Sequence, residues 1–302
     1  MRPGGVDPSA RQRFYNRSSE GSWVSFAAHR REVTARLAAA GGQPGASLGV
    51  LGAGNCNDLD LLRLAEVYAS IHLLDIDAAA MQGGLAHQFA TAPAEAQGLR
   101  ERIRLVPCDL TGALEVCHEY AVAPTSGNLG RLRGALALLP AVAAGGGPFT
   151  TVASTCVLSQ LLSIFRRAMG EGGAELGPVG ELVRWQHLRT VAALAAPGGT
   201  AILFADVVSS ETEPRMLEAP VAGLAALMER VCREGGCFPG MNPAGLVRLL
   251  GGPPLKDCWA GAPEGSAPWV WDLGPRSYLV TAITCRRKGD GGADWLGGGR
   301  VG

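Results

Sequence analysis

The residues best able to do chemistry stand close together, between Leu48 and Asp77. An apolar run at 48–51 is followed by Gly52 and Gly54, and a second apolar run ends in Asp75 roughly 20 residues later. The first run predicts a buried parallel strand, and the glycines allow a tight turn beneath a ligand. A carboxylate that ends the next strand can accept both hydroxyls of a ribose. This order predicts a site for an adenosine-containing molecule.

The residues after the glycines indicate which molecule that is. We expect a helix to start near Asn57 or Asp58, and Asn57 stands where a dinucleotide-binding turn would have its third glycine. An acid in this turn would repel a pyrophosphate, but it suits a ligand that carries an ammonium and a sulfonium. S-adenosylmethionine therefore fits better than NAD. A glycine turn of some other Rossmann-like domain stays open, because G-x-G alone is a weak signal.

Over most of its length the chain resembles the class I S-adenosylmethionine-dependent methyltransferases. In that family the glycine turn approaches the amino acid part of the cofactor, an acid after the second strand holds the ribose, and an acid after the third often meets the adenine amino group. Asp109 closes the third apolar run, RIRLVPCDL. The resemblance implies a cofactor site made of Gly52, Ala53, Gly54, Asn55, Asp58, Asp75, Ile76, Asp109, Leu110 and Ser154.

The resemblance also implies the fold: an α/β, doubly wound, mostly parallel seven-stranded sheet with an antiparallel last strand and helices on both faces. The stretch 148–162 matches the fourth strand and the loop that faces the substrate, and 184–210 matches a helix, a Pro-Gly-Gly turn and the fifth strand. Two further strands within 269–288 are consistent with the antiparallel pair that ends the sheet. Two positions depart from the family: Val50 replaces a frequent acid and Cys56 a frequent glycine, and Asn57 and Asp58 are candidates for replacement contacts.

The resemblance and the composition along the chain predict four regions. Residues 1–12 and the glycine-rich 289–302 are expected to be disordered, and 43–288 to form the methyltransferase-like domain. Residues 13–42 are expected to form an amino-terminal helical lid, with a helix from about Ser22 to Ala40. Its aromatic residues suit either a lid over the cofactor or the apolar stripe of a docking helix. The stretch 216–250 is a second candidate wall of the substrate cavity.

Composition narrows the class of substrate. Lys and Arg number 27, and so do Asp and Glu, so no overall charge attracts nucleic acid. The Pro-Pro-aromatic motif of many amino-methyltransferases that act on nucleic acid is missing after the fourth strand, which favours a small molecule. The sequence has no run of about 20 apolar residues and no signal-peptide core, so we expect a cytoplasmic protein without a membrane span. It also has no C-x-x-C pair and no acidic cluster after the fourth strand, so we expect no bound metal. The oligomeric state does not follow from the sequence.

The predicted reaction needs few catalytic groups. The methyl group of a sulfonium is already activated, so the protein aligns the acceptor and excludes water, and a base is needed only for an acceptor that carries a proton. We expect Thr155 to position the acceptor and Asp206 to accept its proton, with His29 as a base if the amino-terminal helix closes over the site. His187 is more typical of a core or surface histidine. Each of these polar residues could instead satisfy nearby backbone groups.

The predicted function is methyl transfer from S-adenosylmethionine to an unidentified acceptor, most simply a small molecule. Two alternatives stay open. One is a non-catalytic scaffold that binds S-adenosylmethionine or a nucleotide with the same fold, for which the missing acid at Val50 is the best support. The other is an NAD(P)-dependent oxidoreductase with an altered glycine turn, which Asn57 and the closing strand pair disfavour.

Overall fold

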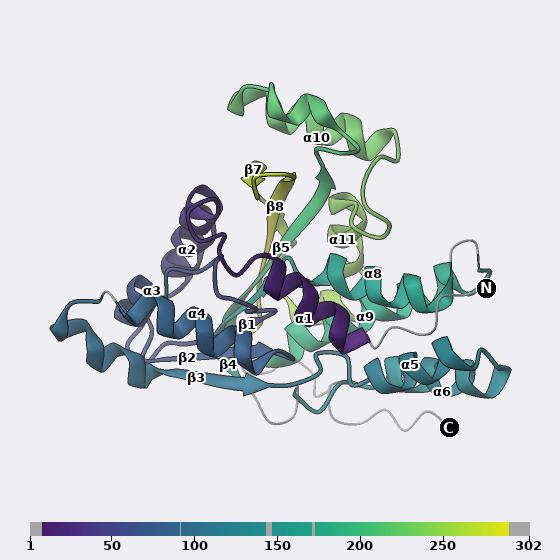
Figure 1. The fold of residues 1–302 in the computed structure, drawn as a ribbon, viewed down its shortest axis with the longest axis horizontal. Helices are drawn as coiled ribbons and strands as arrows, with labels where there is room; N and C mark the ends of the chain where they lie inside the picture. Colours follow the sequence, from purple (N-terminus) through teal and green to yellow (C-terminus); the bar gives the residue numbers. More distant parts are fainter. Residues whose placement is uncertain (1–7, 91, 143–146, 171–172, 290–302) are drawn as a thin grey trace.

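The computed structural model describes residues 8–90, 92–142, 147–170 and 173–289, and one twisted sheet runs through the middle of them (Figure 1). In this part of the chain the sheet has eight strands, seven of them in the order β3-β2-β1-β4-β5-β8-β6. The eighth, β7, pairs with the start of β8 on the edge opposite β5, the same edge that β6 pairs with further along. The strands are β1 (Ser47–Leu51), β2 (Ser70–Asp75), β3 (Ile103–Pro107), β4 (Phe149–Thr155), β5 (Ala195–Ser209), β6 (Glu264–Gly265), β7 (Trp269–Asp272) and β8 (Ser277–Arg286).

The directions of the strands confirm the predicted fold class. Strands β1 to β5 are parallel, whereas β8 runs antiparallel to β5, β6 and β7. The expected seven strands are joined by β6, which has only two residues. The chain order reverses between β1 and β4, and in open parallel sheets the ligand lies at such a point, outside the carboxyl ends of the strands.

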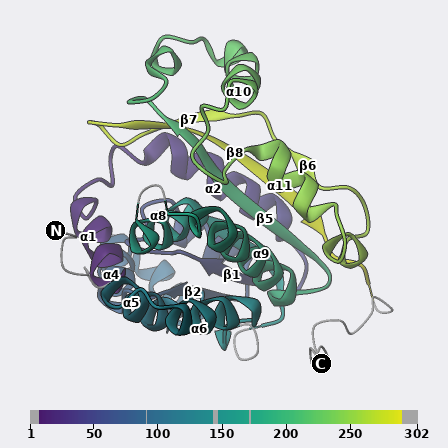
Figure 2. The same cartoon turned by 90° about the vertical axis from the view of Figure 1, so that its right-hand side faces the viewer.

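Helices cover both faces of the sheet (Figure 2). One face packs against α2 (Ala27–Ala40), α3 (Leu61–Val67) and α4 (Ala78–Ala90). The other packs against α5 (Leu114–Val122), α6 (Ser126–Ala137), α8 (Val157–Met169), α9 (Leu176–Leu194) and α11 (Pro243–Leu250). The strands are apolar on both sides because both sides are buried, as the run at 48–51 indicates.

Two segments lie beyond these layers (Figure 1). Helix α1 (Pro8–Ser18) contacts α4, α5 and α8. Helix α10 (Leu224–Arg233) packs with the end of β5 in a small apolar cluster of its own. The remaining helical turns are η1 (Ala94–Arg102), η2 (Pro214–Leu217), η3 (Val221–Gly223) and η4 (Leu255–Cys258).

Three element boundaries differ from the sequence prediction. Helix α1 begins at Pro8, inside the stretch 1–12 that was expected to be disordered, whereas 1–7 and 290–302 lie outside the described residues. Helix α2 begins at Ala27 rather than near Ser22, because Arg30 stacks on Trp23 and donates to its carbonyl oxygen, which holds the preceding turns. Helix α3 begins at Leu61 rather than at 57 or 58, because the Asp60 side chain caps it.

No helix in the described ranges has the length and apolar character needed to cross a membrane. The same ranges contain no group of three or more His, Cys, Asp or Glu side chains arranged to hold a metal ion.

Candidate cofactor and substrate site

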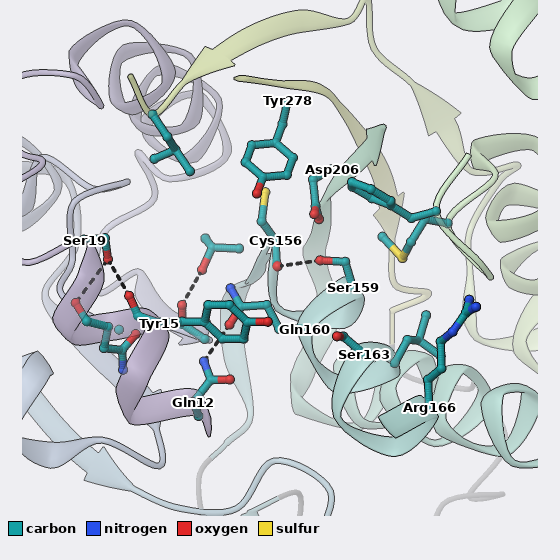
Figure 3. A pocket seen from close by; sticks show the side chains of 18 of the residues that line it. Gln12, Tyr15, Ser19, Cys156, Ser159, Gln160, Ser163, Arg166, Asp206 and Tyr278 are labelled. Carbon is teal, nitrogen blue, oxygen red and sulfur yellow. Dashed lines mark hydrogen bonds between the residues drawn. The ribbon is translucent and has the colours of Figure 1, made fainter. Parts of the chain in front are cut away.

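A cavity of about 860 Å³ lies at the carboxyl ends of the central strands (Figure 3). Its lining includes the glycine turn after β1, the end of β4 and Asp206 of β5. Helices α1 and α8 supply further walls, with Gln12 and Tyr15 on one and Ser159 and Arg166 on the other. The cavity therefore occupies the switch point at which the strand order predicts a ligand.

The glycine turn has the backbone that its residues predict. Gly52 has a φ of +81° and Gly54 a φ of +46°, and residues with a Cβ rarely adopt such positive φ values. A Cβ on Gly52 would also lie 2.4 Å from the Cβ of Val157. Cys56, which stands in place of the family's third glycine, keeps a φ of 56° without being glycine, and Val50, the other departure, is buried in the core. The turn is thus compact even though its third glycine is missing.

Asp75 fixes the turn to the end of β2. Its carboxylate accepts hydrogen bonds from the backbone N–H of Gly54 at 3.0 Å and of Asp77 at 2.9 Å, and the residue is only 2% exposed. Burial raises the pKa of Asp75, while these N–H groups act in the opposite direction. The carboxylate is therefore placed where the sequence predicts it, with both of its oxygens already holding backbone groups.

Asp109 lies beyond the end of β3, near Asp75. Its carboxylate accepts from the Thr111 N–H and hydroxyl at 2.8 Å and from the Leu114 N–H at 3.0 Å, so it shapes the start of α5. Asp75, Ile76, Asp109 and Leu110 line one small cavity of about 20 Å³ together with Gln12. The structure thus brings together the residues expected to hold the adenosine part, around a space that is far smaller than the main cavity.

Helix α1 separates the two spaces. Gln12 lines both cavities and donates from its amide to Gln160 Oε1 at 2.7 Å. The helix is tied to the glycine turn, because the Asn55 amide donates to the carbonyl of Asn16. Just after the helix, Ser19 accepts from the Asn55 amide through Oγ at 3.1 Å and from the Asn57 amide through its carbonyl at 2.7 Å. The polar residues after the glycines therefore hold the amino-terminal segment over the turn.

Two carboxylates face the main cavity, Asp58 from the turn and Asp206 from β5. Burial raises the pKa of Asp206 to about 7, against the effect of the Ser159 hydroxyl. Burial also raises the pKa of Asp58 to about 7, with Arg30 opposing the rise and Asp206 adding to it. The two acids are therefore close enough to repel each other, and both hold protons more tightly than an exposed carboxyl does.

His29 lies behind Asp58. Its Nδ1 accepts from Trp269 Nε1 at 3.1 Å, which leaves the proton on Nε2, 3.5 Å from Asp58 Oδ1. Burial lowers the pKa of His29 to about 3, so the ring is neutral. The residue is fully buried and does not line the cavity, which argues against its predicted role as a general base and favours one in positioning Asp58.

Ser154 and Thr155, at the end of β4, direct their hydroxyls to opposite faces of the sheet. The Thr155 hydroxyl donates to the carbonyls of Leu51 at 3.1 Å and Gly52 at 3.0 Å, so it braces the glycine turn from within the cavity lining. Ser154 lies 2.8 Å from Nε2 of the buried His187 and is not among the lining residues. The predicted cofactor contact of Ser154 is thus not supported, and His187 is a core histidine.

Several lining residues were missed in the sequence. Trp271 and Tyr278 belong to the last strand pair, which the sequence predicts only as part of the sheet and not as part of the site. Ser159, Ser163 and Arg166 project from one face of α8, and their spacing of four and three residues is a helix-face signal that the sequence does contain (Figure 3). Nothing in the local pattern of Gln12 predicts that it reaches the cavity.

The strand order and directions are those of the class I methyltransferase fold. No protein-family model matches the sequence, and a comparison with curated proteins finds no match. Among solved structures, a SAM-dependent methyltransferase from Methanosarcina mazei is 13% identical, with 82% of this chain and 95% of that chain covered and a TM-score of 0.43. The 1,6-didemethyltoxoflavin-N1-methyltransferase of Burkholderia thailandensis is 12% identical, with 95% and 92% covered and a TM-score of 0.42.

Proposed function

We propose that the protein transfers a methyl group from S-adenosylmethionine to a small-molecule acceptor. The observation that supports this most directly is the position of the 860 Å³ cavity, which opens over the Gly52–Gly54 turn at the switch point of a class I sheet. The cavity extends from the turn to Asp206, so it has room for a second ligand beside the cofactor.

The residues around the turn fit the amino acid part of S-adenosylmethionine. The Asp58 side chain is 15% exposed and lines the cavity, while its Oδ1 lies 3.5 Å from Nε2 of the buried His29. A buried carboxylate is costly without an opposite charge, and an ammonium group on its exposed side would supply one. We infer that Asp58 replaces the acid that is missing at position 50, and Ser19 and Ser22 also line the cavity.

The adenosine part would be held by Asp75 and Asp109, with Ile76 and Leu110 against the base. The 20 Å³ around them does not admit an adenosine while Gln12 is bonded to Gln160. Cofactor binding therefore needs a displacement of α1, which is tied to the turn by the bond from Asn55 to the Asn16 carbonyl. We infer that this helix opens before the cofactor enters and closes over it afterwards.

When bound, S-adenosylmethionine supplies an activated methyl group on sulfur. The protein has three tasks in the transfer: to hold the acceptor in line with the methyl group, to exclude water, and to take up a proton where the acceptor carries one. Thr155 fixes the turn that positions the cofactor, α1 covers it, and Asp206 faces the acceptor region.

The closed adenosine part also favours a second candidate, a non-catalytic protein with this fold. One experiment separates the two. We expect calorimetry to show saturable binding of S-adenosylmethionine and S-adenosylhomocysteine, with NADH as the control that does not bind. Transfer of a tritiated methyl group to any member of a small-molecule panel then establishes the enzyme. Binding without transfer favours the scaffold, and a folded protein that binds neither compound contradicts the proposal.

A further inference from the structure

The main cavity carries one carboxylate more than the cofactor can pair. Asp206 is 6% exposed, lies at the carboxyl end of β5 and lines the cavity. Its Oδ1 is buried and has no hydrogen-bond partner among the described residues, and Asp58 Oδ1 has only His29 Nε2 nearby, at 3.5 Å. Each unpaired buried oxygen is unfavourable until a donor reaches it. The cavity is thus arranged for a ligand, or a pair of ligands, that brings two sets of donors.

The cofactor accounts for one of these carboxylates. S-adenosylmethionine has one ammonium group, at the amino acid end that approaches the glycine turn, and Asp58 follows that turn. Asp206 lies on β5 rather than in the turn. It stands beyond Thr155 and Cys156, on the side of the cavity that also holds Tyr278 (Figure 3). Asp206 is therefore left for the acceptor.

Aromatic rings form one wall beside the two acids. The ring centroids of Phe26 and Trp271 lie 5.1 Å apart, those of Trp271 and Tyr278 5.3 Å, and those of Tyr278 and Phe238 6.1 Å. All four residues line the cavity. The face of an aromatic ring is electronegative and attracts a cation, and the ring itself contacts apolar surface. The wall therefore suits a cationic group on an apolar skeleton.

The cations of the cavity do not cancel this preference. Arg276 donates to the Tyr278 hydroxyl at 3.4 Å but is paired with Glu211, and Arg184 lies 3.9 Å from Glu181. Arg166 projects from α8 beyond Ser163, away from Asp206 (Figure 3). The two arginines nearest the aromatic wall thus have carboxylates of their own, whereas Asp206 has no such cationic partner among the described residues.

We propose that the methyl acceptor is a basic amine on an apolar or aromatic skeleton, bound with its nitrogen at Asp206 and its skeleton along the wall of Phe26, Trp271, Tyr278 and Phe238. This inference rests on the proposed methyl transfer. The lone pair of the neutral amine forms the new N–C bond as the S–C bond of the sulfonium breaks, and that electron pair stays on sulfur. Before this step the bound ammonium passes one proton to the Asp206 carboxylate, which frees the lone pair. The methylated product keeps the positive charge, and Asp206 releases its proton to water when the product leaves. The amine thus satisfies the carboxylate before and after transfer.

The test is a set of matched ligand pairs, each an arylalkylamine and the alcohol with the same skeleton, such as 2-phenylethylamine and 2-phenylethanol. Binding is measured by calorimetry and ligand-observed NMR with saturating S-adenosylhomocysteine, and again without it. We expect the amines to bind at least tenfold more tightly than the alcohols. Asp206→Asn should abolish the preference, because the amide presents no charge. Glu229→Gln, on the exposed surface of α10, removes one negative charge elsewhere and should leave the preference intact.

Failure of this inference differs from failure of the proposed function. If S-adenosylhomocysteine binds but the alcohols bind as well as the amines, or no amine binds at all, the inference is overturned and methyl transfer stands. A preference that persists in Asp206→Asn also overturns it, because the nitrogen then lies elsewhere. If S-adenosylhomocysteine does not bind, the proposed function fails, and the measurements without it still show whether Asp206 selects amines.

Discussion

Helix α4 packs closely against the glycine turn at Gly84. A Cβ on Gly84 would lie 2.1 Å from the carbonyl oxygen of Asn55, whereas a Cβ on the neighbouring Gly83 would meet nothing within 4 Å. Both glycines stand in the interior of the same helix. Replacing either by alanine stabilises the helix by about 0.5 to 1 kcal/mol, because the unfolded chain loses freedom.

At Gly84 this gain is opposed by the overlap with the turn. Forcing an additional methyl group into a close-packed contact costs about 1 to 3 kcal/mol. We therefore expect Gly83→Ala to raise the free energy of unfolding, and Gly84→Ala to lie about 1 to 3 kcal/mol below Gly83→Ala. Because the helix must move away from Asn55, Gly84→Ala should also weaken S-adenosylmethionine binding, and Gly83→Ala should leave it unchanged.

The assay is urea unfolding of the two variants and the wild type, followed by circular dichroism, with calorimetric titration of the cofactor. The slope of the free energy against urea should stay constant, so that the midpoints report stability. Equal midpoints for Gly83→Ala and Gly84→Ala would refute the direct packing of α4 on the turn. A destabilised Gly84→Ala that binds the cofactor as the wild type does would refute the link from this packing to the site.

Three further predictions concern single contacts. Ser154→Ala should lower the free energy of unfolding by about 1 to 3 kcal/mol, because it leaves the buried His187 ring without its partner, and cofactor affinity should not change; weaker binding by the folded variant would contradict this placement. Gln12→Ala should tighten cofactor binding up to about tenfold, because opening α1 no longer breaks the bond to Gln160, worth about 0.5 to 1.5 kcal/mol; calorimetry showing weaker binding would mean that Gln12 contacts the cofactor instead. Burial raises the pKa of Asp206 to about 7, so the folded state holds this proton more tightly than the unfolded chain does. The free energy of unfolding of the wild type, relative to that of Asp206→Asn, should therefore fall as pH rises from about 4 to about 7. Urea unfolding curves with no such trend would contradict the burial of this carboxyl.

The central part of the fold could be predicted from the sequence because it depends on local signals. Apolar runs that are buried on both sides, glycines that need a positive φ and acids at strand ends mark β1, β2 and the turn between β1 and α3 without any knowledge of tertiary contacts. The same signals place Gly52 and Gly54 after the carboxyl end of β1 and Asp75 at the end of β2, where the structure has them.

The rest depends on contacts between residues far apart in the chain. Helix α1 starts at Pro8 although its residues look irregular, because Asn16 donates to Asp77 and Gln12 to Gln160. Whether His29 faces the cavity or the core is decided by Trp269, more than two hundred residues away. The direction in which a strand-end hydroxyl points is likewise fixed by the opposite face, where His187 takes up Ser154.

Titration of the purified protein with S-adenosylhomocysteine, comparing the wild type with Asp75→Asn, shows whether the cofactor binds over the Gly52–Gly54 turn. We predict saturable binding that Asp75→Asn weakens by about 10- to 150-fold, the effect of losing hydrogen bonds of about 1.5 to 3 kcal/mol to a charged group. Asp257→Asn, an exposed carboxylate in η4, serves as the control and should bind as the wild type does. Equal affinity in a folded Asp75→Asn, or no binding by the folded wild type, would contradict a cofactor site over this turn.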